Sequence, residues 1–225
     1  MGSGVGGLGV SEDGPEPWAL RAIGILGGTF DPVHLGHLAL AREALAELDL
    51  EQVLFVPNAD PPHKRGQAVT AAHHREAMVT RAIEPEPAFV LSRVELERPG
   101  PSYAVDTVIE MADRSRAEGR PEPWFVLSAE VLEGFHGWRD PEGILRHCRV
   151  AVAPRPGAEP LDRDWVTAHF PGFEDRFTFL PGPELDIAST AIRERIARGQ
   201  PVDDLLPGAV LRYIETEGLY RGRPG

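Results

Sequence analysis

One stretch, residues 27–37 with the sequence GGTFDPVHLGH, constrains the fold of this chain more than any other. An apolar run at residues 22–26 precedes it, and apolar residues recur after it at helical spacing, namely Leu38, Ala41, Leu45 and Leu48. This order predicts a strand, a glycine turn and the first turn of a helix. Ligands of open parallel sheets bind beyond the carboxyl ends of strands, so we expect the turn at a ligand-binding edge.

The helix that begins in this stretch predicts an anion site, because its first N–H groups lack partners and lie at the positive end of the helix dipole. Gly27 and Gly28 allow close approach of the backbone. Gly36 costs the helix about 1 kcal/mol relative to Ala, which indicates that a side chain is excluded there. His34 and His37 stand where acids usually complement the dipole and can donate hydrogen bonds to phosphate. The alternative is an ordinary turn with two surface histidines.

The same string resembles the signature of the nucleotidyltransferase superfamily, G-T/S-F-D-x-x-H-x-G-H. It is not a Walker A loop, and the turn does not read G-x-G-x-x-G. The doubled glycine and His34 resemble the nicotinate-nucleotide adenylyltransferase family, since the pantetheine-phosphate branch typically has Thr at this position. The resemblance implies an ATP site at Gly27, Gly28, Thr29, Phe30, His34, Gly36 and His37.

Strand and helix signals alternate along the rest of the chain. Strands are expected at 52–57, 88–91, 124–127, 148–153 and 177–180, and helices at 71–83, 164–169, 207–220 and after an N-cap at Ser102. Strand–helix–strand units of this length form parallel pairs with a right-handed crossover. With the resemblance, the pattern predicts an α/β, Rossmann-like, doubly wound, mainly parallel sheet with helices on both faces and a small C-terminal helical subdomain.

Three segments resemble the family's motifs for the second substrate. The PPHK sequence in the loop at 58–66 implies that Lys64 meets phosphate, although its charges alone fit a solvated loop. The SYAVDT sequence at 102–107 implies that Tyr103 and Ala104 hold the nicotinate carboxylate on backbone N–H groups, and Ala104 replaces the usual Thr. The third segment contains Trp138 and Arg139, and the resemblance places both at the second substrate, with Trp138 stacked on the pyridine ring. From the sequence alone, packing of Trp138 in the apolar core is an equally weighted alternative.

Two further segments follow predicted strands at the ligand-binding edge, one expected to bind ATP and one the second substrate. Ser128 and Glu130 follow a strand where the family usually has Gly-x-Asp, so the fine geometry of ATP binding is in question. Arg155, in the sequence PRPG, resembles the family's R-P-G and is expected on the substrate rim.

The stretch IASTAIR at 187–193 resembles the family's I-S-S/T-x-x-I-R motif. Ser189 or Thr190 is expected to cap a helix and to bind ATP together with Arg193. A cation in the first turn opposes the dipole, and an external anion would reverse that effect. The alternative is an exposed Arg193 that pairs with Glu194 or Glu217.

The reaction implied by the resemblance is transfer of AMP from ATP to nicotinate mononucleotide, which gives deamido-NAD and pyrophosphate. The mononucleotide phosphate would attack directly, without a general base, since its second pKa is near ~6. His34, His37 and Arg193 would stabilise the growing charge, and Mg²⁺ would arrive with ATP without dedicated protein ligands. The alternatives are another acceptor, nicotinamide mononucleotide or phosphopantetheine, or a non-catalytic nucleotide sensor.

Net charge and hydropathy limit the classes of partner that the chain can bind. A net charge of −12 argues against a general nucleic-acid binder. No apolar run approaches the ~20 residues of a membrane span. Residues 1–20 are expected to be a disordered tail without signal-peptide features, followed by one domain at 21–221. A cytoplasmic enzyme with no nucleic-acid or membrane partner is expected, and a homo-oligomer is left open.

Overall fold

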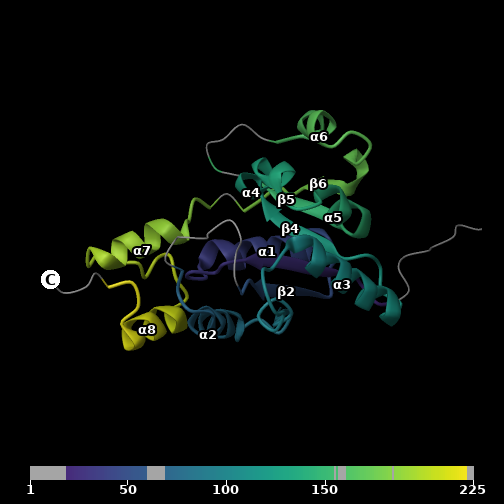
Figure 1. The fold of residues 1–225 in the computed structure, drawn as a ribbon. Helices are drawn as coiled ribbons and strands as arrows, with labels where there is room; N and C mark the ends of the chain where they lie inside the picture. Colours follow the sequence, from purple (N-terminus) through teal and green to yellow (C-terminus); the bar gives the residue numbers. More distant parts are fainter. Residues whose placement is uncertain (1–18, 60–68, 155, 157–160, 184, 222–225) are drawn as a thin grey trace, which may run out of the picture.

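A single six-stranded sheet forms the centre of the molecule (Figure 1). The computed structural model describes residues 19–59, 69–154, 156, 161–183 and 185–221. The sheet order is β3-β2-β1-β4-β5-β6, and every pairing is parallel. The strands are β1 (Ile23–Gly28), β2 (Gln52–Pro57), β3 (Phe89–Leu91), β4 (Trp124–Ser128), β5 (Arg149–Ala153) and β6 (Phe177–Phe179). This is the doubly wound order of dinucleotide-binding folds. The strand order runs outward from β1 in one direction to β3 and from β4 in the other direction to β6, so the order reverses between β1 and β4.

Helices cover both faces of the sheet over two separate apolar cores. Side chains of α1 (Leu35–Glu47) and α2 (Ala72–Ile83) join one core, and those of α3 (Ala104–Glu118), α4 (Ala129–Glu133), α5 (Pro141–His147) and α6 (Arg163–His169) join the other. Two short 3₁₀ turns, η2 (Phe135–Gly137) and η3 (Glu174–Arg176), connect elements of the second layer. Successive residues of β1 point to opposite faces, so Ile25 belongs to the second core and Leu26 to the first.

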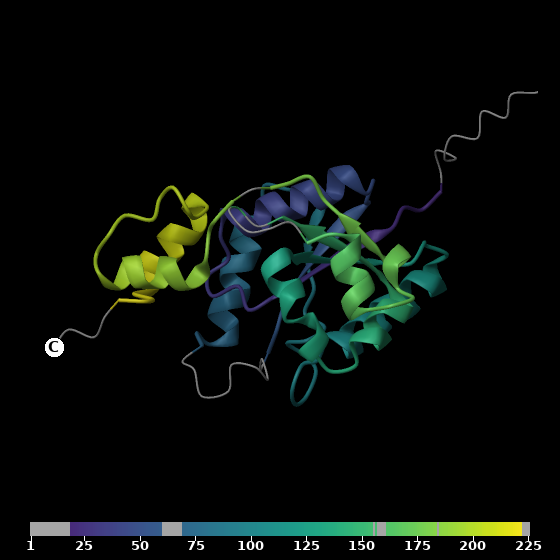
Figure 2. The same ribbon diagram turned by 90° about the horizontal axis from the view of Figure 1, so that it is seen from above.

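The last two helices, α7 (Ser189–Ala197) and α8 (Gly208–Glu217), form a small layer beside the sheet (Figures 1 and 2). Helix α8 buries Val210 and Ile214 and packs on α2. It ends earlier than residue 220, because Gly218 adopts a left-handed conformation with φ 64°.

The two halves of the sheet separate at the carboxyl end, and this separation creates the site. β1 is joined to β2 along its full length, from Ile23 to Gly28. Its register with β4 joins Gly24 to Trp124 and Ile25 to Phe125, after which the two strands part. A crevice therefore opens at the reversal point, where ligands of such sheets bind.

The predicted fold class is confirmed, with differences at element ends. Cys148 is buried at the end of α5 and precedes β5, so it is not part of the strand as expected. Most of the expected tail, residues 1–18, lies outside the described residues. Among the described helices, none is both long and apolar enough to cross a membrane.

Candidate active site

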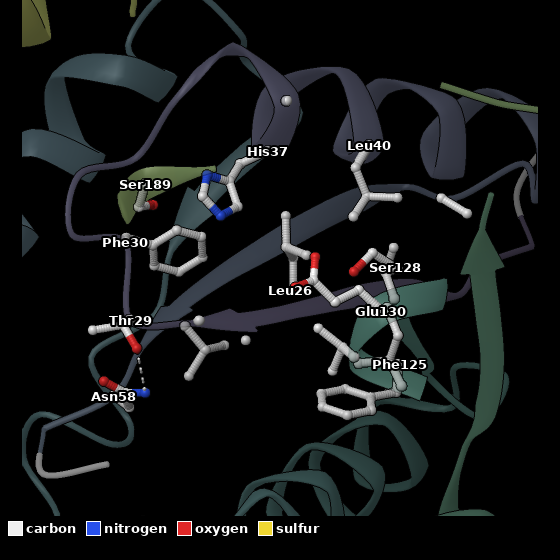
Figure 3. Close-up of a pocket in the computed structure, with 18 of the residues that line it drawn as sticks. Leu26, Thr29, Phe30, His37, Leu40, Asn58, Phe125, Ser128, Glu130 and Ser189 are labelled. Atoms are coloured by element: carbon white, nitrogen blue, oxygen red, sulfur yellow. Dashed lines mark hydrogen bonds between the residues drawn. The ribbon is translucent and has the colours of Figure 1, made fainter. Parts of the chain in front are cut away.

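A cavity of about 690 Å³ occupies the crevice between β1 and β4 (Figure 3). Its volume lies within the range of small-molecule sites, about 300–1,000 Å³. Most of the predicted site residues line it: Gly27, Gly28, Thr29, Phe30, His34, Gly36, His37, Tyr103, Ala104, Ser128, Glu130, Trp138, Arg139 and Ser189. Thr190 and Arg193 lie just outside its lining, whereas Lys64 and Arg155 lie outside the described residues. The cavity thus unites segments from both halves of the sheet.

The three glycines of the first motif lack side chains for different reasons. A Cβ atom on Gly27 would come no closer than 3.7 Å to Phe125, so the protein itself leaves room there. A Cβ on Gly28 would lie 3.1 Å from the Phe30 ring, and one on Gly36 would lie 3.1 Å from His34 Nδ1. Gly27 is therefore the position where a bare backbone faces the cavity, and the other two make room for neighbouring rings.

The hydrogen bonds of His37 determine where its proton lies. Its Nδ1 accepts a bond of 3.2 Å from the His34 backbone N–H, which can only donate. Burial, and to a lesser degree His34, hold the pKa of His37 well below 6.5, so the ring is neutral and carries its proton on Nε2. Figure 3 shows the ring projecting into the cavity. His37 therefore offers an uncharged N–H donor.

His34 is also buried. Its exposed fraction is 6%, and burial lowers its pKa from 6.5 to about 4. Its ring lies against that of His37 at a tilt of 31°, with centroids 3.7 Å apart. Within the described residues its Nδ1 has no hydrogen-bond partner. Both imidazoles are thus neutral, and they can stabilise an anion by hydrogen bonding rather than by cationic charge.

Two helices begin at the cavity, where Gly36 of α1 and Ser189 of α7 line it. At α1, Leu35 donates to the Leu205 carbonyl, while the Gly36 N–H is without a partner in the described part of the chain. At α7, the N-cap is Ala188, which corrects the expectation of a Ser189 or Thr190 cap. The Ser189 hydroxyl instead donates to the Pro32 carbonyl at 2.9 Å. The arrangement of two helix starts suits a bound anion.

Arg193 lies in the second turn of α7 and not in the first, because the helix begins earlier than expected. Its Nη1 donates to the Asp31 carbonyl at 2.7 Å, and its Nη2 to Thr190 Oγ1 at 3.3 Å. In the described structure it forms no ion pair with Glu194 or Glu217. The argument from an opposed dipole therefore fails, and Arg193 joins α7 to the loop before α1.

Aromatic side chains form the other end of the cavity. Trp138 is half-buried and meets Phe125 and Phe135 edge to face, with centroids 6.1 and 5.3 Å away. It is thus anchored in the core and also lines the cavity. The guanidinium carbon of Arg139 lies 4.4 Å from the centroid of the Tyr103 ring. Tyr103, and not Ser102, is the N-cap of α3, so the first N–H groups of that helix face this end.

Three cavity or near-cavity residues escaped the sequence reasoning. Glu95 is buried in the lining and accepts a bond of 2.8 Å from Thr107 Oγ1, and burial raises its pKa. Asn58 donates to Thr29 Oγ1 at 3.4 Å (Figure 3). Beneath them Arg75, 1% exposed, donates to the carbonyls of Thr29 and Thr70, both at 2.8 Å. A charged residue in a helix looks solvated in sequence, so no signal marked Arg75.

Comparisons with known proteins agree with this geometry. The cytidylyltransferase-like family model matches residues 25–195. A protein of Roseiflexus sp. (strain RS-1) named "Probable nicotinate-nucleotide adenylyltransferase" is 41% identical over 88% of this chain and 98% of its own length. A protein of Symbiobacterium thermophilum with the same name is 41% identical over 89% of this chain and 96% of its own.

The fold also matches solved structures. Plasmodium falciparum nicotinic acid mononucleotide adenylyltransferase complexed with NaAD superposes with a TM-score of 0.70 at 19% identity, over 89% of this chain and 97% of that one. The same enzyme complexed with APC gives a TM-score of 0.69. At this identity the likeness establishes the doubly wound fold.

Proposed function

Since the chain belongs to the nicotinate-nucleotide adenylyltransferase family, among the cytidylyltransferase-like proteins, we propose that it transfers AMP from ATP to nicotinate mononucleotide. The products are deamido-NAD and pyrophosphate. One observation carries the proposal: a single cavity joins an anion-binding end at the starts of α1 and α7 to an aromatic end at Trp138. A reaction that joins two nucleotides requires such a two-ended site.

The ATP phosphates fit the end where α1 and α7 begin. The Gly36 N–H, the N–H groups of α7 and the Nε2–H of His37 are donors, and Gly27 leaves the backbone accessible. Ser128, the last residue of β4, and Glu130, in the first turn of α4, face the adenosine side of the cavity. Arg193 holds the loop beside the phosphates and also donates to Thr190, and both residues extend this end.

Nicotinate mononucleotide fits the aromatic end. Trp138 offers a ring for stacking, and the start of α3 at Tyr103 and Ala104 offers backbone N–H donors to the carboxylate. Arg139, above the Tyr103 ring, adds positive charge at this end. We extend the proposal to Lys64 and Arg155 as phosphate contacts on the sequence resemblance, since both lie outside the described residues.

The chemical step needs little from the protein beyond position. The mononucleotide phosphate oxygen forms a bond to the α-phosphorus of ATP as the bond to the bridging oxygen breaks, and pyrophosphate leaves with the electron pair. The attacking phosphate is mostly dianionic near neutrality, so no general base is required. Holding both reactants in line can supply roughly 7–11 kcal/mol, and oriented donors stabilise the growing charge.

We propose Mg²⁺ as part of the ATP substrate. Both carboxylate oxygens of Asp31, the acid beside the glycine turn, already accept hydrogen bonds. In the described residues no group of three or more His, Cys, Asp or Glu side chains is arranged for a metal. The phosphates and water would therefore supply the ligands, as Mg²⁺ commonly accepts.

The proposal is tested by pyrophosphate release from Mg-ATP with three acceptors: nicotinate mononucleotide, nicotinamide mononucleotide and phosphopantetheine. A strong preference for the acid is expected. Preference for another acceptor would reassign the substrate, and ATP binding without release from any of them would make the chain a nucleotide sensor.

A further inference from the structure

The loop between β1 and α1 is held from outside the sheet by the C-terminal segment. Ser189 and Arg193 bind the carbonyls of Pro32 and Asp31, at 2.9 and 2.7 Å. The Leu35 N–H donates to the Leu205 carbonyl at 3.0 Å. These contacts converge on the segment that carries His34, so the C-terminal segment helps define the geometry of the anion-binding end.

A fourth contact comes from Tyr220, which follows α8. Its hydroxyl donates to Asp31 Oδ1 at 2.6 Å across 189 residues of sequence. Asp31 is buried, and its other oxygen accepts a bond of 3.1 Å from the Thr70 N–H. The Asp31 carboxylate would therefore lose one of its two partners if the Tyr220 hydroxyl were removed.

Tyr220 has an unusual backbone conformation. Its φ of 62° lies in the left-handed region, which a large L side chain rarely adopts. Burial, and then the bond to Asp31, raise the pKa of the Tyr220 hydroxyl, so it stays protonated and donates. Tyr220 is therefore a half-buried donor in a backbone conformation that costs free energy, and the contacts around it must compensate for that cost.

We propose that Tyr220 is a positioning residue, whose hydroxyl fixes Asp31 and through it the loop that presents His34 and His37 to ATP. The expected effect of Tyr220 on catalysis rests on the proposed function, whereas its effect on the loop does not. Tyr220 does not line the cavity itself, but its partner Asp31 does.

The path from Asp31 to the two histidines is short. The preceding residue, Phe30, also has a left-handed backbone with φ 51°, and its ring meets that of His37 edge to face at 5.0 Å. Three residues after Asp31, the His34 N–H sets the His37 ring through Nδ1. A displaced Asp31 therefore disturbs His37 from two sides.

The test compares Tyr220→Phe with Tyr213→Phe. Each change removes one hydroxyl, and Tyr213, on α8, contacts His74 Nδ1 at 2.8 Å instead of Asp31. Tyr213 and His74 do not line the cavity. Thermal unfolding and circular dichroism of both variants establish that they are folded.

For Tyr220→Phe we expect kcat to fall about tenfold, because small misplacements of reacting groups reduce rates strongly, with the KM for nicotinate mononucleotide unchanged. The imidazole NMR signals of His34 and His37 should shift. Tyr213→Phe should keep the wild-type kcat and shift the signals of His74. In an Asp31→Ala background, the further change Tyr220→Phe should have no additional effect on kcat.

The positioning role is overturned if Tyr220→Phe leaves the signals of His34 and His37 in place. It is also overturned if activity falls only in proportion to the loss of folded protein. The NMR comparison needs no acceptor or turnover. It therefore decides the positioning role even if the wild-type chain fails to release pyrophosphate, which would count against the proposed function alone.

Discussion

Replacing the buried Arg75 by Met should be among the most destabilising single changes in this chain. The guanidinium lies under the glycine turn and donates to four oxygens: the carbonyls of Thr29 and Thr70 at 2.8 Å, that of Ala59 at 3.2 Å, and Asn58 Oδ1 at 3.3 Å. Met retains much of the apolar stem but no donor. Each acceptor left unsatisfied in a buried place costs about 1–3 kcal/mol.

The two short bonds alone predict a loss of about 2–6 kcal/mol for Arg75→Met, since water or small shifts can satisfy the two longer contacts. This is a large part of a typical stability of about 5–15 kcal/mol. The assay is urea unfolding at equilibrium, followed by circular dichroism and tryptophan fluorescence.

Arg81→Met on the same helix is the matched control. Arg81 is exposed, with its guanidinium 2.8 Å from the Ala77 carbonyl and 4.3 Å from the Tyr213 ring centroid, so its loss should stay under about 1 kcal/mol. Equal losses for the two variants, or a loss below about 1 kcal/mol for Arg75→Met, would refute the idea that Arg75 holds the turn.

Three further predictions concern the histidine end of the cavity. His37→Ala should lower kcat by about 10²–10³-fold, because it removes the Nε2–H donor, with about 1 kcal/mol of lost stability; a near wild-type kcat in steady-state assays would contradict this. Burial lowers the pKa of His34 from 6.5 to about 4, so the unfolded chain binds a proton that the folded protein excludes. The free energy of unfolding should therefore fall as pH drops from about 6.5 to about 4. Urea titrations should show a smaller fall for His34→Asn, and the same dependence on pH in the variant and the wild type would contradict the role given to His34. Gly36→Ala should reduce kcat/KM for ATP about tenfold, because the new Cβ would lie 3.1 Å from His34 Nδ1. The higher helix propensity of Ala should offset the loss of stability from this close contact. An unchanged kcat/KM would show that the His34 ring can move away without loss of function.

The sheet could be predicted from sequence because its strands are short apolar runs, and some of them, such as β1, β2 and β5, end at or just before glycine or proline. Residues 52–57 were predicted as a strand and form β2 with the same bounds. The first motif also placed its glycines and histidines together at the cavity, since they are close in sequence.

Helix starts and long-range contacts could not be read in the same way. The sequence predicts caps at Ser102 and at Ser189 or Thr190, yet the N-caps of α3 and α7 are Tyr103 and Ala188, neither of which forms a side-chain cap bond. The Ser189 hydroxyl binds a carbonyl 157 residues away, a partner that no local rule can identify. Helix starts that are left uncapped at the cavity keep their N–H groups available for a ligand.

The contact between Tyr220 and Asp31 illustrates the same limit. Local periodicity extended the last helix through residue 220, but Gly218 ends it and turns Tyr220 back toward the glycine turn. Buried polar contacts of this kind depend on tertiary structure, which a single sequence does not display.

The most direct test of the account is to follow the label of α-³²P-ATP in the presence of nicotinate mononucleotide. We expect the label to appear in deamido-NAD in a single step, with one pyrophosphate released per dinucleotide. We also expect no exchange of labelled pyrophosphate into ATP when the mononucleotide is absent. Exchange without the acceptor would reveal an adenylylated protein, and label recovered only as free AMP would show hydrolysis; either result would contradict direct transfer between the two ends of one cavity.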